Sequence, residues 1–133
     1  MYLHEEFNSI LQENDSDRMD VAIEGVLMAM FGRQEAFFKQ NQAMMVKNLI
    51  MLLKHTKKKE VNYTDFIEVL LDEVLVKKYL EYLRNSLPEN EPLESPKRIL
   101  IKWYEEEFFG SNIDKVHDVL LGLRTQIQEY QKG

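Results

Sequence analysis

Apolar side chains recur every three to four positions along almost the whole chain, which is the spacing of an α-helix that packs on one side. No stretch shows the apolar–polar alternation of a half-buried strand. Glycine, proline and capping residues divide the pattern into about six helices, at residues 16–31, 34–55, 65–71, 73–86, 96–109 and 113–130. The pattern predicts one all-α domain over residues 1–133, with an extended segment at 1–15 and a compact helical bundle at 16–131.

Capping residues mark the expected helix boundaries. Gly32 and Gly110 each follow the last apolar residue of a helix, where glycine commonly ends one. Pro96 fits the first helical position, since its missing N–H would have no partner there. The expected N-caps are Asn14, Asp15, Ser16 or Asp17, then Asn62 or Thr64, Asp72, Ser95, and Ser111 or Asn112.

The predicted core centres on the helix at 34–55. Its apolar residues cover more than one stripe, so we expect it to be the most buried helix. Phe38 and Trp103 are expected core anchors, and Phe38→Ala is expected to cost ~3–5 kcal/mol. The last helix has a seam for packing on a neighbour, formed by Ile113, Val116, Leu120, Leu123, Ile127 and Tyr130.

Composition narrows the class of protein. A chain of 133 residues with 44% hydrophobic and 30% charged residues is typical of one globular domain, not of a disordered chain. The absence of cysteine excludes disulfides, thiolate zinc sites and a cysteine nucleophile. The sequence has neither a signal-peptide pattern at its start nor an apolar run long enough to span a bilayer. We expect a cytoplasmic domain that is monomeric in isolation.

Residues that could carry catalysis or bind a metal are sparse. His117 has Asp114 three residues before it, but a metal-binding bundle needs a second such pair and further carboxylates. Glu105, Glu106 and Glu107 spread around a helix and predict a solvated face. No phosphate loop, dinucleotide motif or nucleophile elbow occurs. The sequence predicts no enzyme, no cofactor and no metal site, and an enzyme with a carboxylate-based site is the least favoured class.

One basic segment stands out in a chain of net charge −6. Residues 33–61 hold seven basic and two acidic side chains. The candidate contacts for single-stranded DNA or a partner protein are Lys54, Lys57, Lys58 and Lys59. The alternative is a solvated helix end, where cations are favoured.

Methionine is concentrated in the first two predicted helices. Core filling is the default interpretation, and an adaptable groove for a partner is the alternative. The residues concerned are Met19, Met28, Met30, Met44, Met45 and Met51.

Several short segments, taken in order, carry a resemblance to a known module. They are Phe7-Asn8-Ser9-Ile10-Leu11, with Ser9 where the family has proline; the aromatic stretch and Gln-Ala of residues 35–43; Val46-Lys47-Asn48-Leu49-Ile50; the threonine-led helix of residues 63–70; and Leu121-Gly122-Leu123-Arg124-Thr125-Gln126-Ile127. This series resembles the all-α domain inserted in the motor of TraG-like coupling proteins, the ATPases of type IV secretion and conjugation.

The resemblance implies a substrate receptor without catalysis of its own. Such a domain would bind relaxase, a relaxosome accessory protein or the transferred DNA. The parent would be a hexameric ATPase at the cytoplasmic face of the membrane, and it would hold the phosphate loop missing here. The domain itself would not touch the membrane. An inserted domain should bring its two ends together. The alternative is a free-standing bacterial or phage adaptor that regulates a partner by a helix-in-groove contact.

Overall fold

The computed structural model describes the backbone of residues 3–57, 60–110 and 113–132. Within these ranges the chain is all-helical, with seven α-helices, one π-helical turn and no strand, which confirms the predicted class. The helices are α1 (Leu3–Gln12), α2 (Ser16–Phe31), α3 (Ala36–Thr56), α4 (Tyr63–Leu71), α5 (Glu73–Ser86), α6 (Pro96–Trp103) and α7 (Ile113–Lys132), and the π-helical turn η1 (Tyr104–Phe108) follows α6 directly.

The extended segment predicted at residues 1–15 is wrong. Residues Leu3–Gln12 form α1, which packs against α2 and α4. Phe7, Ile10 and Leu11 have the helical spacing i, i+3, i+4 and are all buried. The Phe7 ring stacks on Phe66 of α4 with 4.8 Å between ring centroids. Burial of this apolar face accounts for a helix that begins without a recognisable cap in the sequence.

Most predicted helix boundaries are confirmed. Asp15 caps α2 by accepting the N–H of Arg18, and Gly32 follows with a positive φ of 70°. Asn62 forms a capping box with Asp65 at the start of α4. Asp72 caps α5, and Ser95 with Pro96 starts α6. The predicted caps Ser111 and Asn112 lie outside the described residues.

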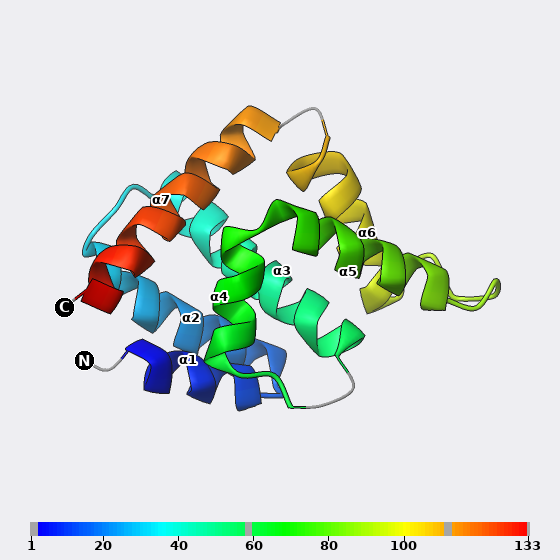
Figure 1. The fold of residues 1–133 in the computed structure, drawn as a ribbon, viewed down its shortest axis with the longest axis horizontal. Coiled ribbons are helices and arrows are strands. Elements are labelled where there is room, and N and C mark those ends of the chain that lie inside the picture. The colour runs from blue at the N-terminus through cyan, green and yellow to red at the C-terminus, as the bar shows by residue number, and fades with distance from the viewer. Residues whose placement is uncertain (1–2, 58–59, 111–112, 133) are drawn as a thin grey trace.

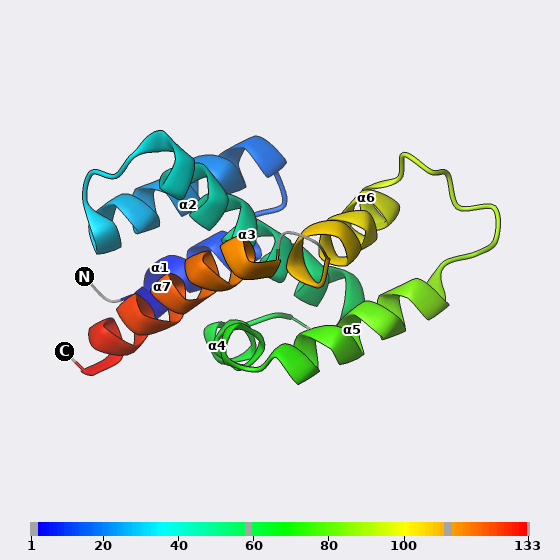
Figure 2. The same cartoon turned by 90° about the horizontal axis from the view of Figure 1, so that it is seen from above.

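Helix α3 lies at the centre of the bundle, as predicted, and contacts α2, α4, α5, α6 and α7 (Figures 1 and 2). Its buried apolar residues are Met45, Val46, Leu49, Ile50, Leu52 and Leu53. Phe38 was expected in this core, and that expectation is wrong because its side chain is 47% exposed. The reason is tertiary: the first buried residue of α3 is Gln42, so the opening turn and a half of the helix has no buried residue. Trp103 is partly buried.

The helix predicted at residues 96–109 changes geometry at Tyr104. The N–H of Phe109 donates to the carbonyl of Tyr104 at 2.9 Å, the five-residue spacing of a π-helix. Gly110 is required here, because an added Cβ would lie 2.1 Å from the carbonyl oxygen of Glu106. The turn buries both Tyr104 and Phe108 completely, while Trp103 stays at the surface edge of the core.

The start of α1 and the end of α7 lie at the same end of the molecule in both views (Figures 1 and 2). Among the described residues, no helix combines the length and apolar character needed to cross a membrane.

Candidate functional site

The basic segment is tied into the fold where the structure describes it. Lys54 Nζ donates to the backbone carbonyl of Glu13, and burial lowers its pKa. Lys57 Nζ lies 2.8 Å from Asp65 Oδ1, with both side chains more than 80% buried. The hydrogen bond that Lys57 donates to the Asp65 carboxylate raises the Lys57 pKa. Lys58 and Lys59 lie outside the described residues. A contact role for these four lysines stays a prediction, and two of them already have intramolecular partners.

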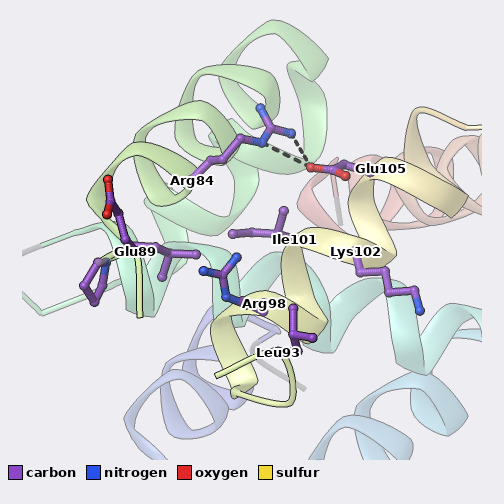
Figure 3. Close-up of a pocket in the computed structure, with 9 residues that line it drawn as sticks. Arg84, Glu89, Leu93, Arg98, Ile101, Lys102 and Glu105 are labelled. Carbon is purple, nitrogen blue, oxygen red and sulfur yellow. Dashed lines mark hydrogen bonds and ion pairs between the residues drawn. The ribbon is translucent and has the colours of Figure 1, made fainter. Parts of the chain in front are cut away.

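A pocket of about 420 Å³ lies between α5, α6 and the loop that joins them (Figure 3). Arg84 donates to Glu105 Oε1 through Nε and Nη2, at 3.1 and 2.8 Å. Arg98 Nε donates to the carbonyl of Glu91 at 2.8 Å and so holds the loop. Lys102 extends away from both arginines (Figure 3). Because its arginines hold the loop and the neighbouring turn, we interpret this pocket as structural.

An apolar groove of about 490 Å³ lies between α3 and α6. Five residues of α3 line it, and four of them follow one another at steps of four, three and four positions, which places those four on one helical stripe. Met44 is 49% exposed on one wall, and Ile99 is 58% exposed on the other. We call this feature the α3–α6 groove; its lining is Met44, Lys47, Asn48, Met51 and His55 from α3, Pro96, Ile99, Leu100 and Trp103 from α6, and Ser16 from α2.

A second hollow, of about 320 Å³, adjoins this groove and shares Met44 and Trp103 with it. It runs between α3, η1 and α7, where Val116, Val119 and Glu107 line it. The stripe on α3 continues from Met44 toward the start of the helix, at steps of three and four positions, through Asn41 to Phe37. The side chain of Phe37 is 47% exposed. From Phe37 to His55 it spans about 27 Å at the rise of an α-helix.

Charged groups border the groove unevenly. The ammonium of Lys47 lies 2.7 Å from Asp20 and 2.8 Å from the hydroxyl of Ser16, so its charge is balanced. Lys97, next to Pro96, has no carboxylate within ion-pair distance in the described part of the chain. Burial, and then the charge of Lys97, lower the pKa of His55. Nε2 of His55 is buried and has no hydrogen-bond partner among the described residues.

His117 lies away from this groove. Its Nε2 is 3.6 Å from Glu73 Oε1, and Arg124 of α7 reaches the same carboxylate at 3.7 Å. Arg124 Nε also donates to the carbonyl of Leu70, which joins α7 to the end of α4. Asp114 is exposed. Among described side chains, no group of three or more histidines and carboxylates is close enough to hold a metal ion.

Sequence reasoning found only one wall of the groove. The methionine concentration was interpreted first as core filling, which fits buried residues such as Met45, and only in the alternative as a partner surface; Met44 and Met51 line the groove. Trp103 was assigned to the core, and Ile99 was not singled out. The sequence does not indicate the other wall, because α6 comes to lie beside α3 only when the helices pack together.

No family model, curated protein or solved structure matches the chain. What the fold and the groove define is a class: a helical protein with an open apolar groove bordered by polar and charged side chains.

Proposed function

We propose that the chain is a non-catalytic recognition module whose α3–α6 groove binds an amphipathic helix of a partner protein. The observation that carries this proposal is the groove itself, with Met44 and Ile99 half exposed on opposite walls and Trp103 at the junction of the two hollows. A helix bound in a groove buries an apolar stripe with the i, i+3/i+4, i+7 spacing. The stripe on α3 offers about 27 Å for that contact. Methionine suits such a surface because its flexible side chain adapts to different partners.

A protein helix fits this groove better than nucleic acid does. Binding to phosphates depends on cations that are free to release counterions. Lys54 and Lys57 are engaged inside the fold, and the chain as a whole has a net charge of −6. The groove is lined mostly by apolar side chains, which offer little to a phosphate backbone.

The particular form we propose is the substrate-receptor domain of a type IV secretion coupling protein, with relaxase or a relaxosome accessory protein as the partner. The juxtaposition of the start of α1 and the end of α7 supports this form, because a domain inserted in a motor needs its two ends side by side (Figures 1 and 2). A free-standing adaptor would use the same groove. A binding titration with purified relaxase distinguishes the receptor domain from the free-standing adaptor. The receptor form predicts that relaxase binds the wild-type protein and that Ile99→Asp abolishes this binding. Single-stranded DNA should not displace the bound relaxase.

The general proposal is tested by selection from a displayed library of helical peptides of about 18 residues, the length of the stripe. Peptides selected on the wild-type protein should bind with an apolar stripe and should lose binding to Ile99→Asp. The matched control is Leu121→Asp, since Leu121 is 63% exposed on α7 and does not line either hollow. Selected peptides that bind both variants equally would contradict the proposal.

A further inference from the structure

We infer that Met44 is an oxidation site of the α3–α6 groove, and that its conversion to the sulfoxide by a peroxide lowers the affinity of the groove for an apolar helix. This inference rests on the proposed function and adds to it a modification site and the regulation that follows from it.

Methionine is the only source of oxidisable sulfur in the chain. The sequence contains seven methionines and no cysteine, so no thiol of the chain competes with the thioethers for a mild oxidant. Hydrogen peroxide transfers one oxygen atom to a thioether: the sulfur is oxidised to the sulfoxide, the O–O bond breaks, and water leaves. Oxidation of this protein by a peroxide is therefore a reaction of its accessible methionines.

Exposure distinguishes the methionines that the structure describes. Three have at most 5% of their surface exposed, namely Met19, Met30 and Met45. Met51 is partly buried and packs against the core. Met28 and Met44 are 46% and 49% exposed, so a peroxide in solution reaches these two most easily.

Only one of these two exposed methionines lies at the groove. Met44 lines both the α3–α6 groove and the adjoining hollow, as Trp103 does. Met28 lines neither of them. Oxidation of the two residues should therefore have different consequences for binding, although their exposed fractions are nearly equal.

A sulfoxide at Met44 replaces an apolar part of the wall by a polar group. Its oxygen is a strong hydrogen-bond acceptor, and an apolar helix in the groove would withdraw it from water without offering a donor. A polar group left unpaired in this way costs enough free energy to weaken binding about tenfold. Because position 44 lies where the two hollows meet, a helix along the α3 stripe cannot avoid it.

The experiment compares the wild-type protein with Met44→Leu and Met28→Leu, each before and after treatment with hydrogen peroxide. Leucine has a similar apolar volume and no sulfur, so both variants should fold, which circular dichroism checks. The ligand is a helical peptide without methionine, selected on the untreated wild-type protein and added after the peroxide is removed. Oxidation should weaken its affinity about tenfold for the wild-type protein and for Met28→Leu, and should leave its affinity for Met44→Leu unchanged.

Two further measurements connect the loss of binding to the sulfoxide. Mass spectrometry of proteolytic peptides should show an added oxygen atom on Met44 and Met28 before any appears on Met45. Methionine sulfoxide reductases of both stereospecificities, with a dithiol as reductant, should then restore the affinity of the oxidised wild-type protein. In that step the sulfoxide oxygen leaves as water and the dithiol becomes a disulfide.

Three results would contradict the inference. Wild-type protein that carries the sulfoxide at Met44 but binds as before, while Ile99→Asp still abolishes binding, would overturn it and leave the proposed function standing. An equal loss of affinity in oxidised Met44→Leu would also overturn it, because the sensitive residue would then lie elsewhere. Peptides that bind Ile99→Asp as tightly as the wild-type protein would overturn the proposed function together with the inference.

Discussion

The hydroxyl of Tyr104 donates a 2.8 Å hydrogen bond to the backbone carbonyl of Asn48. The bond joins the π-helical turn to the middle of α3 next to the α3–α6 groove, which Asn48 lines. Burial raises the pKa of this phenol well above its ordinary value, so the donor keeps its proton. Because the turn follows α6 directly, this contact holds α6 and α3, the two walls of the groove, next to each other.

Tyr104→Phe removes this bond and nothing else from the side chain. We expect a loss of about 1 kcal/mol in the free energy of unfolding, because a net hydrogen bond in a folded protein contributes about that much. Thermal unfolding should show a midpoint a few degrees lower. Tyr82→Phe is the control, since Tyr82 is 48% exposed, and it should leave the midpoint unchanged. Equal effects of the two substitutions would show that the bond to Asn48 contributes nothing.

Phe38 and Phe66 should respond very differently to truncation. Phe66→Ala should cost ~3–5 kcal/mol, since its ring is fully buried against Phe7. Phe38→Ala should cost less than about 1 kcal/mol, because about half of its side chain already contacts solvent. Urea denaturation of the two variants measures both values. A loss at Phe38 as large as that at Phe66 would mean that Phe38 packs in the core after all.

The ion pair between Lys57 and Asp65 should contribute to the stability of the fold. Lys57→Glu replaces a largely buried ion pair by two carboxylates, and we expect it to cost about 3–5 kcal/mol. Lys78→Glu makes the same charge change at an exposed position and should cost almost nothing. Thermal unfolding of both variants gives the comparison. A variant with Lys57→Glu as stable as the wild type would indicate that this lysine is free to contact a ligand.

Stability should fall in mild acid because of His55. Its pKa is lowered in the folded chain, so below the ordinary value of 6.5 the unfolded chain binds more protons than the folded one. Protonation then favours unfolding, and the stability lost as the pH falls returns as the pH rises through this window. His55→Gln should reduce the difference between unfolding midpoints at pH 7.5 and pH 5.5. An unchanged difference in His55→Gln would assign the pH dependence to other groups.

Local signals in the sequence predicted the parts of the fold that depend on local chemistry. Asp72 and the pair Ser95-Pro96 start helices where expected, because a cap satisfies the N–H groups of its own helix. Helix α1 was missed because a short apolar pattern without a cap does not distinguish a helix from an extended segment, and only packing of Phe7 on Phe66 decides.

The groove could not be predicted for a related reason. Whether Phe38 is buried depends on how far the neighbouring helices extend along α3, and that is a property of the assembled bundle. Met51 and Ile99 lie far apart in the sequence, and neither position alone indicates an open surface. The π-helical turn at Tyr104 shifts the register of the following aromatic residues in a way that apolar spacing does not reveal.

The most direct measurement uses Trp103, the one tryptophan of the chain, as a reporter inside the groove. A selected helical peptide without tryptophan is titrated into the protein while the emission of Trp103 is recorded. A saturable shift to shorter wavelength is the predicted result, because the peptide covers the exposed part of the indole, and Ile99→Asp should abolish the shift while Leu121→Asp retains it. Binding detected by calorimetry with no change in Trp103 emission, and with equal affinity for Ile99→Asp, would contradict the assignment of the α3–α6 groove as the binding site.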